Sequence, residues 1–289
     1  MNRRILKDRF NSVLIKGLAL TGIIVLIGLF IFIIKESVPA LTKVGADLFT
    51  NFSWYPTYED DPEYGLLTMI IDSGLITLLA SVIVIPIGYF VAFFMYDYAN
   101  KFEKGIIKSA IDSLSGVPSV VIGMFLILYV SPIFLKLNIW SGQNMLLGAL
   151  GLVVLSLPYT ASLMEESLSS VDKSLKEGSL ALGSTRWTAG FKIVTRAALP
   201  GIVNSMILTV NRIIGETMVV LMAAGGANII PESLFDPIRT LTSTIASEMG
   251  EVAVGSMHYS ALFVAGLVLL IVSFILTLTS KYLSRRWSR

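Results

Sequence analysis

The sequence predicts an all-α integral membrane protein with six transmembrane helices. Of the 289 residues, 54% are hydrophobic and only 15% are charged, and the mean hydropathy is +0.77. Soluble domains carry about 25% charged residues, so a water-soluble globule is disfavoured. The formal net charge of +2 is too small and too dispersed to indicate a nucleic-acid partner. Because the chain has no cysteine, disulfides, thiolate metal sites and cysteine nucleophiles are excluded.

The spans follow from the length of apolar sequence that a bilayer requires, which is about 20 residues. Five segments carry no charged side chain at all: 17–34, 73–95, 113–135, 145–164 and 259–280. A sixth apolar segment, 201–225, is interrupted by Arg212 and Glu216. The basic start of the chain resembles a signal peptide, but the apolar run that follows exceeds the usual signal core. We therefore expect a retained first helix.

The orientation follows from the distribution of basic residues, since lysine and arginine concentrate in short cytoplasmic loops. With the N-terminus inside, most of the lysines and arginines fall in inner segments: 3–16, 101–108, 173–196 and 281–289. The outer segments 35–72 and 226–258 are mainly acidic. The sequence therefore predicts a multi-pass protein of the cell inner membrane, surrounded by lipid, with both termini in the cytoplasm.

The whole chain, 1–289, is expected to form a single transmembrane domain. We expect an irregular outer loop at 35–72, where the acidic and aromatic run WYPTYEDDPEY contains two prolines. The outer segment 226–258 is predicted to form a turn and a short helix. The inner segment 165–200 is the largest cytoplasmic piece.

A polar stripe is predicted along the fifth span. Placing an ionised group in mid-membrane costs about 2.5 to 3.5 kcal/mol, so Arg212 and Glu216 are candidate functional residues. Their spacing of four would let them pair on one helix. Ser205 and Thr209 fall on the same face, within an arc of roughly 60°, and Thr217 adds a hydroxyl nearby. Such a stripe is expected to face other helices or a hydrated pathway.

Two interpretations of the charged pair remain open. Polar groups in membranes also serve packing, so the two residues can form a structural ion pair that locks helices or subunits together. Alternatively, Arg212 contacts an anion transiently, because its donor fork matches phosphate-like oxygens. Glu216 would then orient or neutralise Arg212, or accept a proton-bearing oxygen of the ligand.

The inner segment 165–200 reads as a pair of short helices. Residues 165–182 are predicted to form a helix that turns at Gly183. Ser184 or Thr185 can cap a second helix that carries Trp187. An exposed tryptophan beside two short helices indicates a docking surface, and the alternative is a solvated connection with one face resting on the membrane.

This segment resembles the EAA loop of ABC-importer permeases, which docks on the ATPase. The resemblance rests on Glu177, Gly178, Ser179, Gly183 and Ile193, with Gly178 and Ser179 in place of the two usual alanines and Arg196 where a proline is usual. It implies ATPase coupling by a set of residues within 165–200: Glu177, Gly178, Ser179, Ala181, Leu182, Gly183 and Trp187.

A second resemblance is to the phosphate-specific ABC permeases of the PstC type. It rests on NRIIGETMVVLMAAG (211–225), GVPSVVIG (116–123) and TLTSTIASEMGE (240–251), and Asn211 departs from the expected small residue before the arginine. The resemblance implies the MetI-like fold of a type I ABC importer permease. The implied partners are a PstA-type permease, two PstB-type ATPases that bind ATP and magnesium, and an extracytoplasmic PstS-type phosphate-binding protein.

The implied function is ATP-driven import of inorganic phosphate by alternating access. The expected pathway residues share a position on the third or fifth span: Arg212, Glu216, Thr217, Thr209, Ser205, Ser119 and Pro118. A proline in a span bends its helix, so a static kink is the alternative for Pro118 and Ser119.

Enzymatic activity in this chain is not expected. The chain lacks the G-x-x-x-x-G-K-[ST] phosphate cradle, so it cannot bind ATP by that mechanism, and energy must come from a partner or a gradient. No cofactor, metal or catalytic residue is predicted in this chain. The single histidine, His258, is expected to have an interfacial structural role. The open alternatives are a permease for molybdate, sulfate or phosphonate, a stand-alone secondary anion carrier, and a purely structural membrane subunit.

Overall fold

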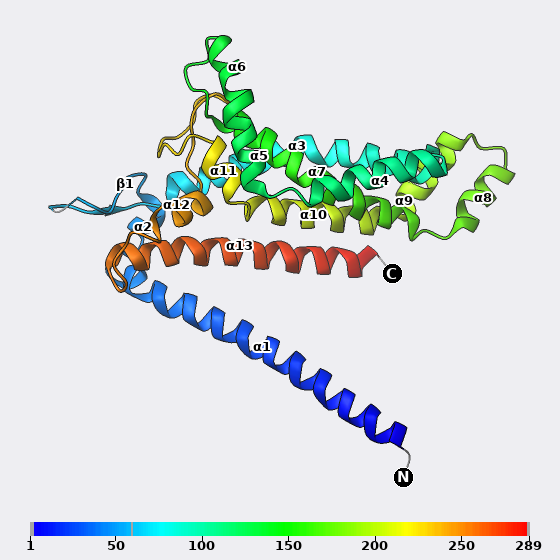
Figure 1. Cartoon of the computed structure of the whole chain (residues 1–289), viewed down its shortest axis with the longest axis horizontal. Coiled ribbons are helices and arrows are strands. Elements are labelled where there is room, and N and C mark those ends of the chain that lie inside the picture. Colours follow the sequence, from blue (N-terminus) through cyan, green and yellow to red (C-terminus); the bar gives the residue numbers. More distant parts are fainter. Residues whose placement is uncertain (1–2, 59, 288–289) are drawn as a thin grey trace.

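The computed structural model describes residues 3–58 and 60–287, and in it long helices run side by side as a bundle (Figure 1). Five helical runs in this part of the chain are long and apolar enough to cross a membrane: Asn11–Lys43, Leu67–Tyr98, Ser119–Lys136, Met145–Ser169 and Met257–Ser284. A sixth candidate consists of Thr188–Ala197 and Leu199–Ile214, which meet at an angle of 71°. The predicted all-α membrane fold is confirmed, with six spans when the bent pair is taken as one.

The long helices are α1 (Arg3–Lys43), α3 (Leu67–Phe93), α7 (Met145–Ser169), α10 (Leu199–Ile214) and α13 (Met257–Trp287). The shorter helices are α2 (Asp47–Thr50), α4 (Lys101–Ser115), α5 (Ser119–Phe125), α6 (Ser131–Lys136), α8 (Lys173–Ala181), α9 (Thr195–Ala197), α11 (Met218–Ala223) and α12 (Leu241–Glu248). Three π-helical segments continue or precede these helices: η1 (Phe94–Tyr98), η2 (Leu126–Val130) and η3 (Thr188–Val194). A small antiparallel hairpin pairs β1 (Trp54–Tyr55) with β2 (Glu63–Tyr64).

The centre of the bundle is the contact between α3 and α7, on which α10 packs. Ile76, Leu152 and Ile213, one from each of these helices, are almost completely buried in one apolar cluster. Gly88 lets α3 approach α7 closely, because a Cβ atom at this position would lie 2.7 Å from Cγ2 of Thr160. The small side chain is therefore a packing requirement of this interface.

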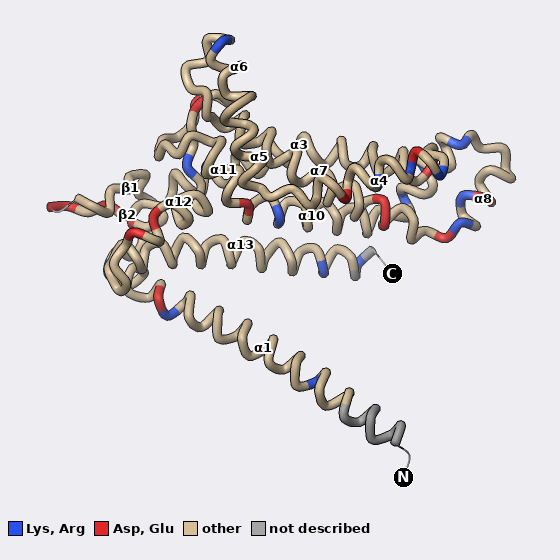
Figure 2. The backbone as a smooth tube through the Cα atoms, in the orientation of Figure 1, with Lys and Arg blue, Asp and Glu red and all other residues tan. Residues whose placement is uncertain are grey.

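Charged residues gather at the two ends of the bundle, and few lie along its middle (Figure 2). The described ends of the chain lie at the same end of the bundle as α8, whereas the hairpin and α12 lie at the opposite end (Figure 1). We call these the α8 end and the hairpin end. Helix α1 meets α13 through contacts such as Phe32 with Phe263 and diverges from it toward the α8 end. That the α8 end faces the cytoplasm stays a prediction.

The predicted third span, 113–135, is wrong at its start. Asn100 caps α4 through a reciprocal box with Glu103, and α4 ends at Ser115. Pro118 then adopts an extended conformation at the N-cap of α5, so it begins a helix and does not bend one. A residue before proline avoids the α-helical conformation, which explains why the helix does not run through Val117. The third span is Ser119–Lys136.

The predicted fifth span, 201–225, is also discontinuous. Helix α10 ends at Ile214, α11 begins at Met218, and Gly215–Thr217 forms a break between them. Glycine weakens a helix at such a position because it has more conformational freedom to lose. Before α10, the helical segment Thr188–Ala197 (η3 and α9) meets α10 at the 71° bend described above.

The connecting segments are more ordered than expected at the hairpin end and more divided at the α8 end. Within 35–72, α1 continues to Lys43, and α2 and the hairpin follow. The predicted short helix in 226–258 is α12, which Thr240 caps. The predicted helix 165–182 is split, because α7 ends at Ser169 and α8 begins at Lys173. Gly183 forms the predicted turn with a φ of 87°.

Replacing Gly88 by alanine is expected to lower the free energy of unfolding by about 1–3 kcal/mol, because the new methyl group overlaps Thr160. Gly74→Ala is the matched control, since Gly74 lies in the same helix with open space around its Cβ position. That control is expected to be neutral or stabilising by up to about 1 kcal/mol. Thermal unfolding of the detergent-solubilised proteins measures both, and equal midpoints would contradict the packing argument.

Candidate functional site

The break between α10 and α11 is the centre of the candidate site. The carbonyl of Glu216 accepts a hydrogen bond of 3.0 Å from the hydroxyl of Thr242 in α12. The backbone N–H of Glu216 donates to the carbonyl of Ile213. The Thr217 hydroxyl donates to the carbonyl of Gly215 at 3.4 Å. Backbone groups that leave a helix need partners in a membrane. Here a hydroxyl from a distant segment supplies one of them.

Arg212 lies in the last turn of α10 with its side chain exposed in this single chain. Its guanidinium carbon is 5.2 Å from the centre of the Tyr159 ring on α7, which is a cation–π contact. Among the described residues no ion pair joins Arg212 to Glu216. The predicted pairing is wrong because α10 ends at Ile214 and Glu216 leaves the helical phase on which that spacing depended.

Ser205 and Thr209 lie on the face of α10 that packs against α7. Both are buried, and their hydroxyls lie 3.2 Å from Ser167 Oγ and 3.1 Å from Thr160 Oγ1, respectively. Ser205, Thr209 and Arg212 therefore all face α7, and of the predicted stripe only Glu216 leaves the helix, at the break. The structure gives these two hydroxyls a packing contact between helices, and the pathway role predicted for them stays a prediction.

Pro118 and Ser119 lie at the start of α5, beside the helix that follows the break. Pro118 is the N-cap, and Ser119 is half-buried as the first helical residue. Helix α5 packs on α11 so closely that a Cβ on Gly123 would lie 2.8 Å from Sδ of Met222. The described contacts include no hydrogen bond from the Ser119 side chain to the break.

Hydroxyl groups that the sequence analysis missed surround the other side of the break. A small hollow is lined by residues of α3, of the α10–α11 break and of the start of α12: Ser73, Ile76, Thr77, Ile213, Ile214, Glu216, Val220, Thr240 and Thr242. Ser73 and Thr77 are four residues apart, so helical spacing places them on one face of α3. That spacing and the hydroxyl run from 240 to 244 were available as signals.

Two buried side chains of α3 hold the start of α12 in place. Asp72 accepts a hydrogen bond of 2.9 Å from the backbone N–H of Arg239, and Ser73 accepts one of 3.0 Å from Leu241. Asp72 is fully buried. The sequence analysis missed it because the charge-free stretch was taken to begin at residue 73, although α3 begins at Leu67.

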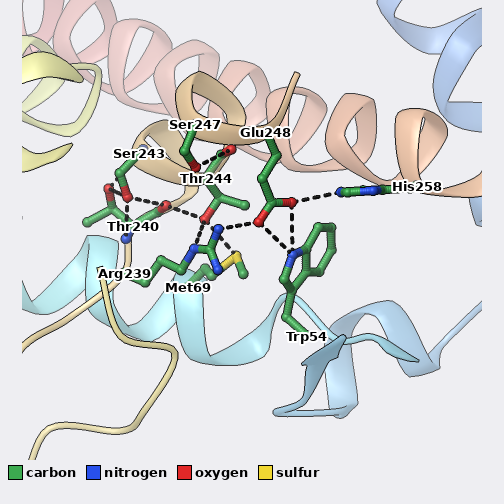
Figure 3. A network of polar contacts seen from close by, with 9 residues as sticks. All are labelled: Trp54, Met69, Arg239, Thr240, Ser243, Thr244, Ser247, Glu248 and His258. Atoms are coloured by element: carbon green, nitrogen blue, oxygen red, sulfur yellow. Dashed lines mark hydrogen bonds and ion pairs between the residues drawn. The ribbon is translucent and has the colours of Figure 1, made fainter. Parts of the chain in front are cut away.

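At the hairpin end, Glu248 is the acceptor of a polar network (Figure 3). Arg239 donates to Oε1 of Glu248, the ring nitrogen Nε2 of His258 lies 2.7 Å from Oε2, and the Trp54 indole donates to Oε2 at 3.1 Å. Arg239 also donates to Thr244 at 3.1 Å. His258 thus joins a structural network, and its predicted place at the membrane interface stays a prediction. The network borders an open cavity of about 660 Å³ that the hairpin and α12 share.

The residues predicted to couple to the ATPase lie on and after α8 at the α8 end (Figure 1). Most of them are exposed, with Ser179 half-buried: Glu177, Gly178, Ser179, Ala181, Leu182, Gly183 and Trp187. Leu182 is 89% exposed at the turn. Trp187 stacks on Phe191 with ring centres 5.0 Å apart. The structure therefore places this set at one end of the bundle, with most of its members exposed.

Local bonds fix the ends of this helix pair. The backbone N–H of Ser174 donates to the Asp172 carboxylate at 2.9 Å, which caps α8 and holds the pKa of that carboxyl below its ordinary value. Thr185 accepts from the Thr188 N–H at 3.2 Å, as the predicted cap requires. The sequence analysis missed Asp97 of η1, whose carboxylate is paired with Lys176 and Arg186.

The chain is similar to known transport proteins. Residues 84–289 match the family model described as "Binding-protein-dependent transport system inner membrane component". A probable ABC transporter permease protein, YqgH, of Bacillus subtilis is 36% identical over 83% of this chain and 78% of its own length. The phosphate transport system permease protein PstC of Mesorhizobium japonicum is 28% identical over 99% of this chain and 92% of its own length.

Two solved structures share the fold. One belongs to a bacterial ABC transporter involved in the import of the acidic polysaccharide alginate, with a TM-score of 0.66, 15% identity and coverage of 99% of this chain and 100% of that chain. The other is the MetNI methionine ABC transporter in an inward-facing conformation, with a TM-score of 0.61, 18% identity and coverage of 78% and 96%. These likenesses confirm the predicted MetI-like fold.

Replacing Glu248 by glutamine is expected to lower the free energy of unfolding by about 2 kcal/mol, because Arg239 and His258 lose a shared carboxylate that is largely shielded from solvent. Glu251→Gln is the control, since Glu251 borders the same cavity but is exposed. The measurement is thermal unfolding in mild detergent. If the two variants unfold at the same temperature, Glu248 does not stabilise the hairpin end.

Proposed function

The chain belongs to the family of binding-protein-dependent transport system inner membrane components, and we propose that it forms half of the pathway for inorganic phosphate in an ATP-driven importer. The chain is a multi-pass permease subunit of an ABC importer. Similarity to PstC proteins over nearly the whole chain supports phosphate as the substrate. In this proposal the permease works by alternating access, and both of its termini lie in the cytoplasm.

One observation carries the proposal: Arg212 presents an exposed guanidinium beside a break in an apolar helix, and it has no ion pair with a described residue of this chain. A guanidinium matches the oxygens of a phosphate with two parallel hydrogen bonds. Glu216 and Thr217 lie in the break itself and are half-buried. In the proposed pathway Arg212 contacts the anion, and Glu216 accepts a proton-bearing oxygen of phosphate or neutralises Arg212 between transport events.

The proposed pathway also includes four residues that support the break from neighbouring positions: Pro118, Ser119, Ser205 and Thr209. Ser205 and Thr209 fix α10 against α7 and so set the position of Arg212. Helix α5 packs on α11 at Gly123, and α11 follows Glu216 and Thr217. A movement of α5 or α10 would therefore change the surroundings of the break.

The partners are proposed from the family. They are a second permease of the PstA type, two PstB-type ATPases that bind ATP and magnesium, and an extracytoplasmic PstS-type phosphate-binding protein. A PstA-named protein of Methanocaldococcus jannaschii is 26% identical to this chain, which supports a related partner permease. The coupling segment 165–200 is proposed to receive the ATPase at the exposed surface around Leu182.

Other functions predict different behaviour. A permease for molybdate, sulfate or phosphonate would transport that oxyanion in competition with phosphate. A stand-alone secondary carrier would move anions in liposomes without ATPase partners, and a structural subunit would tolerate apolar residues at positions 212 and 216. Uptake assays with the isolated chain and with the assembled complex separate these cases.

Arg212→Lys is expected to lower phosphate uptake by the assembled transporter at least about tenfold, because a charge-assisted hydrogen bond is worth about 1.5–3 kcal/mol and lysine cannot supply the fork. Assembly with the partner subunits is expected to remain normal. The measurement is uptake of labelled phosphate into liposomes that contain ATP.

Arg286→Lys is the control for this substitution, because Arg286 is an exposed arginine in the last turns of α13. It is expected to retain full uptake. Normal uptake by the Arg212 variant would remove the proposed anion contact, whereas loss of assembly in both variants would point to expression and not to transport.

Leu182→Asp is expected to abolish most capture of the ATPase subunits, because it places a charge on the exposed apolar turn of the proposed coupling surface. Leu137→Asp is the control, since Leu137 is 66% exposed after α6, toward the other end of the bundle. Co-purification of the ATPase with the permease measures the effect. Equal capture by both variants would show that this turn does not bind the ATPase.

A further inference from the structure

The carboxylate of Asp97 lies at the inner contact between the bundle and α8. It belongs to η1, which continues α3, and its side chain is 0% exposed. One oxygen, Oδ1, accepts from Lys176 Nζ at 2.6 Å and from Arg186 Nε at 2.9 Å. Lys176 lies on α8, and Arg186 lies beyond the turn at Gly183. A single carboxylate oxygen therefore holds both sides of the turn.

Tyrosines on either side of Asp97 strengthen this contact. Lys176 Nζ lies 5.1 Å from the centre of the Tyr96 ring, and the guanidinium carbon of Arg186 lies 4.8 Å from that of Tyr98. Cations at these distances are attracted to the face of an aromatic ring. Each cation is thus held by the carboxylate and by an adjacent ring of the same short segment.

The second oxygen of Asp97 faces η3. A Cβ atom on Gly190 would lie 2.2 Å from Oδ2, so glycine allows the backbone of η3 to reach the carboxylate. Oδ2 is buried without a hydrogen-bond partner among the described residues. Three parts of the 165–200 segment, namely α8, the residues after the turn and η3, therefore converge on one side chain.

Little else fixes α8 to the bundle. Helix α8 contains no fully buried side chain, so no apolar core holds it in place. Its contacts run to η3, and Phe191 of η3 and the preceding Trp187 pack against Phe93 at the end of α3. A displacement of α8 therefore acts on α3 through the ion pairs and through this aromatic cluster.

We propose that Asp97 is the positioning residue that couples α8 to α3, so that movement of the ATPases at the exposed turn is transmitted to the transmembrane helices. This inference rests on the proposed docking of the ATPase on residues 165–200. Removing the charge would leave Lys176 and Arg186 without their shared acceptor, and α8 would then act on α3 only through η3 and the aromatic cluster.

The test uses Asp97→Asn in the complete transporter, with both permeases, the ATPases and the phosphate-binding protein in liposomes. Asparagine keeps the shape and removes the charge. ATP hydrolysis per assembled complex is expected to change less than twofold, while phosphate transported per ATP falls at least tenfold. A merely structural role would lower both activities in proportion to the amount of folded complex. Unchanged phosphate transport per ATP would overturn the inference.

Two further variants keep the test decisive. Lys104→Met is the matched control, because Lys104 of α4 pairs at 2.6 Å with Glu165 of α7 and, among the described residues, forms no ion pair with α8 or with the turn that follows it. It is expected to retain phosphate transport per ATP. Lys176→Met keeps the length of the side chain without its charge and leaves Asp97 paired with Arg186. If Asp97→Asn does not assemble, the same tenfold loss in Lys176→Met supports the inference, and full coupling in it overturns the inference.

A separate measurement tests the premise. Because the chain has no cysteine, Leu182→Cys introduces a unique thiol at the exposed turn. Protection of this thiol from maleimide labelling by the bound ATPase supports the proposed docking, and full labelling in the complex refutes it. A protected thiol together with normal coupling in Asp97→Asn would refute the role of Asp97 alone.

Discussion

The discontinuity at Gly215–Thr217 depends on one constraint, which is that a backbone group released from a helix in an apolar environment must find another partner. Thr242 of α12 supplies a hydroxyl to the Glu216 carbonyl. That contact requires α12 to lie against the break, and Asp72 and Ser73 of α3 hold its start there. The network around Glu248 then secures the other end of α12 to the hairpin. The ordered hairpin end of the molecule is thus tied to a break in a helix of the bundle.

At each end of the bundle, one carboxylate accepts hydrogen bonds from more than one side chain and so attaches a peripheral element, the hairpin at one end and α8 at the other. At the hairpin end, Glu248 is 20% exposed on its side chain and receives Arg239, His258 and Trp54. At the α8 end, Asp97 is fully buried and receives two cations, each of which also lies over a tyrosine. Breaking a buried pair by removing one partner is costlier than breaking an exposed pair. The attachment of α8 therefore depends more strongly on a single side chain than the attachment of the hairpin does.

The sequence predicted the apolar spans, because these depend on the number and position of apolar residues. The spans around 17–34, 73–95, 145–164 and 259–280 lie within continuous helices because no charge interrupts them. The starts and breaks at Pro118 and Gly215 were missed, since the residues around them remain apolar and hydropathy does not register backbone geometry. The same error produced the predicted pair of Arg212 and Glu216. Asp97 was not predicted because its partners come from residues about 80 to 90 positions later, and only the fold brings them together.

The environment of Arg212 argues against a self-contained ion pair with Glu216. A self-contained ion pair would need Glu216 as its partner, and that pair is not formed among the described residues. An arginine at membrane depth costs about 2.5–3.5 kcal/mol, and a cation–π contact with Tyr159 returns about 0.5–2 kcal/mol. The balance has to come from outside the chain, from an anion, from water in a pathway or from a neighbouring subunit. Each of these sources places the exposed face of α10 toward an interior surface of the assembly and away from lipid, which is the position that a permease half requires.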